Sequence, residues 1–260
     1  MVKITVLHNE LEKFVNEDSG LSLLIEAYKM KILFDVSYKD DIFINAAQKN
    51  INLEKIDYLI ISHGHIDHTE GLMHIDFRQV KCVLCHPLCL KKKYYQKKVL
   101  IGSPFSSQEI KQKTRIILSK EPFWIKKNKI IFLGEIPRLN SFEGKTSVGN
   151  VENGEKDFVI DDSAIAIKSQ KGLIVISGCS HSGICNTINY AIDVCNEKKV
   201  FALIGGFHLF NKEQTDKTIE FIKQINIEHI YPMHCLDEYA FSEFEKIGGK
   251  KVKTLDAINL

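Results

Sequence analysis

Short apolar, β-branched runs alternate with amphipathic stretches along most of the chain. The apolar runs predict β-strands at residues 3–7, 21–27, 31–35, 56–61, 81–85, 163–168, 173–177, 199–204 and 229–231. Apolar residues at helical spacing, or acidic residues suited to a helix start, predict helices at residues 40–47, 69–75, 183–195 and 212–225. A short turn should join the strands at 163–168 and 173–177 into a hairpin. This alternation is typical of an α/β protein.

Residues 99–157 have the weakest pattern, because prolines and glycines interrupt them. The only tryptophan, Trp124, lies there and either packs in the core or lines a substrate pocket. Just before this region, Pro87 favours a helix start, and a basic run at 91–98 contains two tyrosines. Such a run predicts a solvated helix face, with a rim that attracts an anionic substrate as the alternative. His86 fits a turn or a supporting contact better than a metal ligand.

The composition fits one globular domain over residues 1–260, with 44% hydrophobic residues to supply a core. Because 35 basic residues balance 33 acidic ones, the net charge is only +2, and we expect no nucleic-acid partner. No apolar run reaches the ~18 residues that a membrane-spanning helix needs. The first residues also lack the features of a signal peptide, so we expect a cytoplasmic protein without membrane contact.

The seven cysteines are odd in number, and the chain is not a small secreted scaffold, so free thiols are expected. The spacing of Cys82, Cys85 and Cys89 raises an iron–sulfur site as an alternative. A cluster usually needs four thiolates, however, and a strand would send Cys82 and Cys85 to opposite faces. Buried small apolar side chains are therefore the favoured interpretation.

Three imidazoles and a carboxylate are concentrated in the six residues from His63 to His68. The motif is His63, His65, Asp67 and His68, and it directly follows the apolar strand at 56–61. Open α/β sheets bind ligands at this end of their strands. Imidazole nitrogens with one carboxylate suit Zn²⁺, Fe or Mn. Four such ligands in one loop exceed the needs of a single tetrahedral site, so we predict two metals rather than a polar loop with incidental histidines.

Three later strands end in the same way, each followed by a histidine. The strand at 173–177 leads to Cys179 and His181, and the strand at 199–204 leads through two glycines to His208. The strand at 229–231 leads to His234. We expect all three histidines at the same edge of a sheet as the first motif.

The His-x-His-x-Asp-His motif resembles that of the metallo-β-lactamase superfamily. Residues 31–35, 178–183, 205–209 and 232–235 resemble its other site segments, and the last three, with 134–138, resemble one branch. That branch is the dihydropterin–ribofuranosylaminobenzene phosphate synthase-like proteins. The resemblance implies an αββα sandwich of two mixed β-sheets with helices on the outer faces. It also implies a single domain with a variable lid or insert at about 88–157.

The resemblance assigns His63 and His65 to a first metal, and Asp67, His68 and His234 to a second. His181 should bind one of the two metals, and which of them stays open. Asp35 should orient a ligand imidazole. Cys179 lies near the place of a usual aspartate ligand and is either a thiolate ligand or a structural thiol. We expect Asp67 and His208 to act in catalysis, with His208 facing the substrate unless it is only a hydrogen-bonded structural histidine.

These features predict a metal-dependent hydrolase that acts on a small anionic, phosphorylated substrate through a metal-bound water or hydroxide. The cofactors would be two divalent ions, with zinc expected and iron or manganese as alternatives. One alternative is a synthase or transferase that joins a dihydropterin to a ribofuranosylaminobenzene phosphate. A second is a non-catalytic metal-binding or redox sensor protein, against which the complete ligand set argues. The substrate is the expected partner, and a homo-oligomer stays open.

Overall fold

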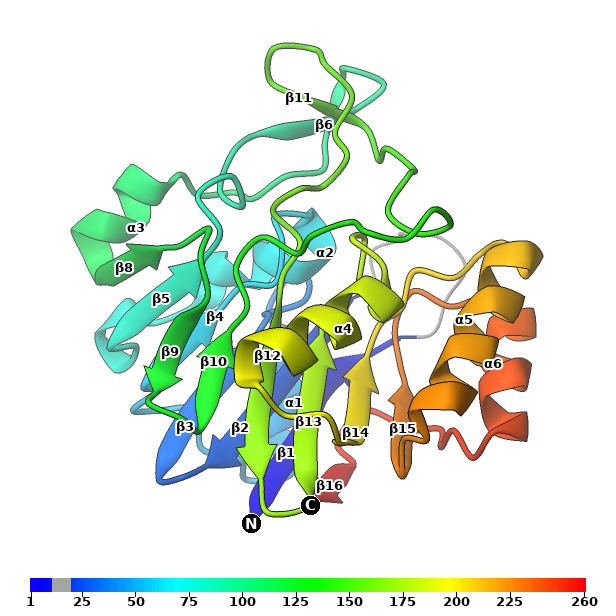
Figure 1. Cartoon of the computed structure of the whole chain (residues 1–260). Coiled ribbons are helices and arrows are strands. Elements are labelled where there is room, and N and C mark those ends of the chain that lie inside the picture. Colours follow the sequence, from blue (N-terminus) through cyan, green and yellow to red (C-terminus); the bar gives the residue numbers. More distant parts are fainter. Residues whose placement is uncertain (11–19) are drawn as a thin grey trace.

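Two mixed β-sheets pack face to face in the computed structural model, which describes residues 1–10 and 20–260 (Figure 1). Within the described residues, the first sheet has seven strands in the order β16-β1-β2-β3-β4-β5-β8. Their bounds are β1 Val2–Asn9, β2 Leu21–Ala27, β3 Met30–Phe34, β4 Tyr58–Ile60, β5 Cys82–Cys85, β8 Arg115–Leu118 and β16 Ala257–Asn259. β3, β4, β5 and β8 are parallel neighbours, so their carboxyl ends share one edge.

Among the described residues, the second sheet has six strands, in the order β15-β14-β13-β12-β10-β9. Their bounds are β9 Phe123–Lys126, β10 Ile130–Phe132, β12 Ala164–Ser169, β13 Gly172–Ser177, β14 Val200–Gly205 and β15 His229–Pro232. β12 and β13 form the predicted antiparallel hairpin, whereas β13, β14 and β15 are parallel. β13 and β14 are buried along their whole length, as strands covered on both faces should be.

Helices cover the outer faces of both sheets, which gives the predicted αββα sandwich (Figure 1). The longer helices are α1 Asp41–Gln48, α3 Ser107–Lys113, α4 Ile184–Cys195, α5 Lys212–Ile225 and α6 Glu238–Lys246. One core, with Phe34 and Phe132, lies between the sheets, and two further cores lie under the helices. Cys85 and Cys89 are buried in the core beneath α1 and α3, in the apolar role expected of them.

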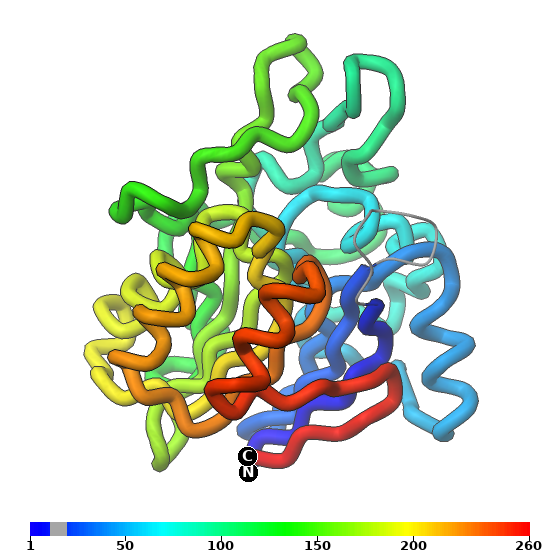
Figure 2. Tube along the Cα trace, turned by 90° about the vertical axis from the view of Figure 1, so that its right-hand side faces the viewer, coloured from blue at the N-terminus to red at the C-terminus, as the bar shows by residue number. Residues whose placement is uncertain are grey.

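A small third sheet lies apart from the sandwich and consists, among the described residues, of three strands (Figures 1 and 2). They are β6 Lys93–Tyr95, β7 Val99–Leu100 and β11 Asn150–Val151. The chain termini lie side by side at the opposite end (Figure 2). None of the helices in residues 1–10 and 20–260 is both long and apolar enough to span a bilayer.

The predicted helix after Pro87 is wrong, because residues 87–90 form a turn and the basic run continues as strand β6. In this run Lys93 is only 1% exposed, whereas Lys91, Lys92, Lys97 and Lys98 are exposed. The predicted helix at 69–75 begins earlier, as α2 Ile66–Thr69 followed by the 3₁₀ turn η1 Glu70–His74. A second 3₁₀ turn, η2, spans Phe77–Gln79. Trp124 lies on β9 and packs, partly buried, against the core beneath α4.

Candidate metal centre

The histidine motif lies in the loop that leaves β4 and in the short helix α2 that follows it. Asp35, directly after β3, holds the start of this loop. Its Oδ1 accepts the Ser62 backbone N–H at 2.7 Å, and its Oδ2 accepts the Ser62 hydroxyl at 2.7 Å. The Asp35 carboxylate also lies 2.8 Å from His68 Nδ1, which therefore donates its proton, so that Nε2 faces Cys179 Sγ at 3.1 Å and Asp67 Oδ2 at 3.6 Å. Through this contact Asp35 would orient the His68 imidazole.

Three histidine rings form a first group. The ring centroids of His63 and His65 are 4.7 Å apart, and each lies 4.8 Å from that of His181. Nε2 of His65 and Nε2 of His181 are buried and have no hydrogen-bond partner among the described residues. Buried polar atoms usually have a partner, so these two nitrogens are candidate donors to a bound group.

A second group lies beside the first. Donor atoms of Asp67, His68, Cys179 and His234 all lie within 4.8 Å of one another. His234 Nε2 is 3.1 Å from Asp67 Oδ2, and His68 Nε2 is 3.6 Å from the same oxygen. Cys179 also lies within 4.8 Å of donor atoms of His63 and His181, so its sulfur stands between the two groups.

Burial sets the protonation of the first group. It lowers the pKa of His63 and of His181 well below the usual value, and the neighbouring imidazoles add to this. Burial, with Lys93 nearby, lowers the pKa of His65 to about 4. These imidazoles are therefore neutral near pH 7 and present nitrogen lone pairs, which is the form that binds a metal.

In the second group, the carboxylate and the imidazoles stabilise each other's charged forms. Although burial opposes ionisation, His68 and His234 hold the pKa of Asp67 well below its usual range. Burial likewise opposes a charge on His68, but Asp67 and Asp35 raise its pKa. The pKa of His234 is raised well above its usual value by Cys235 and Asp67, again against burial. A divalent ion here would take the place of these protons beside Asp67.

The donors present fit divalent metals. Imidazole nitrogen, thiol sulfur and one carboxylate are the ligand types that Zn²⁺ prefers, and iron or manganese also accept nitrogen and carboxylate ligands. Nε2 of His63 and Nδ1 of His65, 3.0 Å apart, and the unpartnered Nε2 of His181 support the same conclusion from geometry.

His208 lies at the border of the first group. Its ring centroid is 4.2 Å from that of His181 and 5.1 Å from that of the 41%-exposed Phe210. Its Nδ1 is buried without a hydrogen-bond partner among the described residues. A side chain at Gly206 would collide with the carbonyl oxygen of Gly178 at 2.3 Å, so this glycine is what lets the chain come so close to the site.

Several supporting residues were not predicted from the sequence. Ser62 contacts Asp35, and Asn9 Oδ1 accepts the His234 backbone N–H at 3.0 Å. Cys235 Sγ lies 3.1 Å from Cys179 Sγ, and each is a free, buried thiol. Ser62 and Cys235 are direct neighbours of predicted ligands in the sequence, a signal that could have found them. Asn9 had no such signal.

A model of the metallo-β-lactamase superfamily matches residues 15–189. The chain belongs to the metallo-β-lactamase superfamily. This superfamily member is 35% identical to the 7,8-dihydropterin-6-methyl-4-(β-D-ribofuranosyl)-aminobenzene-5'-phosphate synthase of Methanocaldococcus jannaschii, across 83% of this chain and 80% of the relative. It is also 30% identical to an uncharacterized protein of the same organism, across 95% and 94% of the two chains.

A solved structure described as a metal-dependent hydrolase of the β-lactamase superfamily shares the fold with a TM-score of 0.83 and 27% identity. The match covers 100% of this superfamily member and 99% of that chain. The fold and the branch that the sequence motifs predicted are thereby confirmed.

Proposed function

We propose that this protein is a dinuclear metal-dependent hydrolase that acts on a small anionic, phosphorylated substrate. The observation that carries the proposal is the pair of adjacent, buried donor groups, with Nε2 of His65 and His181 left unpartnered among the described residues. The resemblance over the full chain to a metal-dependent hydrolase supports it.

His63, His65 and His181 are the ligands of the first metal in this proposal, and Asp67, His68 and His234 are those of the second. His181 joins the first metal because its ring lies 4.8 Å from both His63 and His65. Cys179 is within reach of both positions, and coordination to a divalent ion deprotonates a thiol, so its thiolate is a further shared ligand.

Two divalent ions in these positions would lower the pKa of a water molecule and stabilise negative charge that develops on the substrate. The chain supplies the geometry and the proton transfers. Asp67 Oδ2 lies beside Nε2 of His234 and Nε2 of His68, so the three would hold the second ion together. His208 is half-buried beside His181, where its imidazole can donate a proton to a leaving group.

A synthase is the second candidate, favoured by the 35% identity to the dihydropterin-linked synthase. In that reaction the same site would promote a condensation that expels an anionic leaving group. The two candidates differ in the acceptor, which is water for the hydrolase and an arylamine for the synthase.

The deciding experiment is turnover by protein loaded separately with Zn²⁺, Mn²⁺ and Fe²⁺. The substrates are a phosphodiester, a thioester, a lactam and the dihydropterin–arylamine pair. The proposal predicts hydrolysis of the phosphodiester that disappears on chelation and returns with metal. Condensation of the pterin pair without phosphodiester hydrolysis would select the synthase, and hydrolysis that survives chelation would contradict both.

His208→Ala should retain both metals and lose turnover by about 10²–10⁴-fold, the usual contribution of general acid–base catalysis. The reason is that His208 borders the metal ligands, which already number three for each metal without it. Metal content by elemental analysis and steady-state kinetics on the active substrate check this expectation.

The matched control is His74→Ala, since His74 is an exposed histidine on η1 outside the site. It should change neither metal content nor turnover. Loss of a metal in His208→Ala would make His208 a ligand, and full activity would reduce it to a structural histidine.

A further inference from the structure

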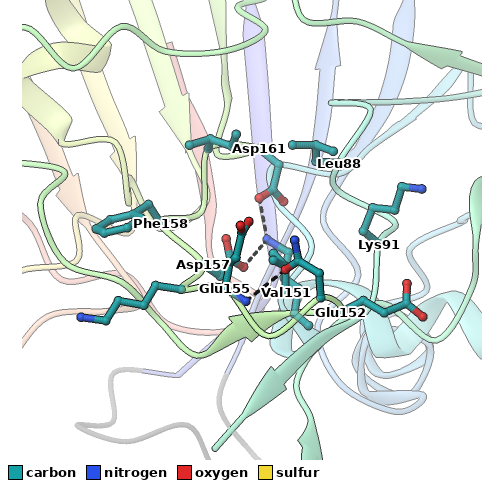
Figure 3. A pocket seen from close by; sticks show the side chains of 12 residues that line it. Leu88, Lys91, Val151, Glu152, Glu155, Asp157, Phe158 and Asp161 are labelled. Atoms are coloured by element: carbon teal, nitrogen blue, oxygen red, sulfur yellow. Dashed lines mark hydrogen bonds and ion pairs between the residues drawn. The ribbon is translucent and has the colours of Figure 1, made fainter. Parts of the chain in front are cut away.

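A buried group of three charges connects the third sheet to the metal loop. Lys93, on β6, is 1% exposed, and its Nζ lies 2.5 Å from Asp161 Oδ1 and 2.9 Å from Asp157 Oδ2. The carboxylates of Asp157 and Asp161 point toward the same ammonium group in Figure 3. They form one wall of a cavity of about 420 Å³ whose lining comes from residues 88–93 and 151–161.

Lys93 and Asp161 stay ionised. Although burial opposes a charge on each, Asp161 and Asp157 raise the pKa of Lys93, and Lys93 lowers the pKa of Asp161. A buried ion pair persists when further hydrogen bonds satisfy the remaining oxygens. Here each carboxylate uses its second oxygen for a backbone N–H group, and the two N–H groups lie in very different places.

Asp161 Oδ2 accepts the N–H of Gly64 at 2.8 Å, and Gly64 stands between His63 and His65. Asp157 Oδ1 accepts the N–H of Val159 at 2.7 Å, within its own loop. Asp161 is thus the member of the triad that holds the metal loop, at a sequence separation of 97 residues from Gly64.

Gly64 is also confined from the other side. A Cβ at this position would lie 1.9 Å from the carbonyl oxygen of Cys89, so the loop backbone is pressed against the segment that leads to Lys93. The peptide after His65 is fixed as well, because the Ile66 N–H donates to the Ile101 carbonyl at 2.8 Å. The direction of the His63 and His65 side chains therefore depends on how the peptide that carries the Gly64 N–H is held.

We propose that Asp161, charged and oriented by Lys93, is a positioning residue that sets the first metal position by holding the Gly64 peptide. This inference rests on the proposed function for the metal position, and it extends the site to a residue outside every motif of the sequence. Asp161 need not touch metal or substrate, since it acts through the backbone between two ligands.

The test is Asp161→Asn against Asp157→Asn. In each variant the remaining amide oxygen should face Lys93, because the ammonium is the stronger donor and repels the amide NH₂. With the amide oxygen on Lys93, the NH₂ group faces the backbone N–H of Gly64 in one variant and of Val159 in the other, and that N–H loses its acceptor. The two variants share the change in charge and the loss of one backbone acceptor, and they differ only in whether Gly64 or Val159 is affected.

The probe is Zn²⁺ alone, titrated into protein from which a chelator has removed all metal. Anomalous scattering at limiting Zn²⁺ then identifies which of the two positions binds more weakly. Asp161→Asn should bind Zn²⁺ about 10–100-fold more weakly at the first position, which is the usual effect of losing a contact that supports a metal ligand. Its affinity for Zn²⁺ at the second position should not change. Asp157→Asn should bind both ions as the parent protein does. If the asparagine variant does not fold, Asp161→Glu takes its place. It keeps the charge but is one methylene longer, so it should weaken Zn²⁺ binding at the same position.

Equal Zn²⁺ binding by folded Asp161→Asn, or by Asp161→Glu in its place, would overturn the inference. So would equal weakening by both asparagine variants, because that would reveal a purely structural triad. Failure of the proposed function is distinguishable, since it would appear as absent turnover in protein whose Zn²⁺ titrations follow the expected pattern.

Discussion

Asp67→Ala should lower turnover by about 10⁴-fold, the upper end of what the loss of one catalytic group usually costs. Asp67 is 3% exposed, and its carboxylate lies between His234 and His68, so its removal takes away one of the three ligands of the second metal. The variant should also lose the second metal while it keeps the first. Steady-state kinetics and elemental analysis at matched free Zn²⁺ measure both effects.

Asp76→Asn is the control for a carboxylate change, because Asp76 is a surface residue paired with Arg78. It should leave turnover and metal content unchanged. If Asp67→Ala loses less than about 10²-fold in turnover, Asp67 does not have the role assigned to it.

Asp35→Ala should lower the free energy of unfolding of the metal-free protein by about 3–5 kcal/mol, the usual cost of removing one partner of a buried charged pair. Asp35 is fully buried, and its carboxylate accepts the Ser62 N–H, the Ser62 hydroxyl and His68 Nδ1. All three donors would remain buried without their acceptor. Denaturant unfolding of chelated protein gives the value directly.

Ser62→Ala provides a graded comparison, because it removes the hydroxyl contacts with Asp35 Oδ2 and His63 Nδ1 and keeps the backbone N–H that Asp35 accepts. It should cost about 0.5–1.5 kcal/mol for each of the two contacts, the net contribution of one hydrogen bond. Equal costs for Asp35→Ala and Ser62→Ala would show that the backbone and His68 contacts do not depend on the carboxylate.

The placing of the candidate site was predictable because it follows from the topology of parallel strands. β13, β14 and β15 are adjacent and parallel, and they lead to His181, His208 and His234 in turn. β3 and β4 are paired with Phe34 opposite Ile60, which brings Asp35 next to Ser62. A strand pattern followed by a polar residue is visible in the sequence, and the shared edge then brings these residues together.

The role of the basic run was not predictable, because it depends on partners far along the chain. Lys93 looks like its neighbours in the sequence, and only Asp157 and Asp161, more than sixty residues away, make it a buried residue. Local periodicity carries no information about such a contact. The Cys179–Cys235 contact, across 56 residues, was hidden for the same reason.

Other elements were missed because their patterns are weak. β8 has an apolar run of only three residues, half-exposed at the edge of its sheet, and β16 has only two apolar residues, so each signal is short. α6 did carry a usable signal, since the Asp237 side chain accepts the Ala240 N–H and caps the helix start. Reading that cap would have added this helix to the prediction.

The number and location of bound metals test the central claim most directly. The protein prepared without chelators and saturated with Zn²⁺ should contain two ions per chain by elemental analysis. Anomalous scattering from its crystals should place one ion among His63, His65 and His181 and the other among Asp67, His68 and His234. A single ion that leaves Asp67 and His68 uncoordinated at saturation would contradict the account.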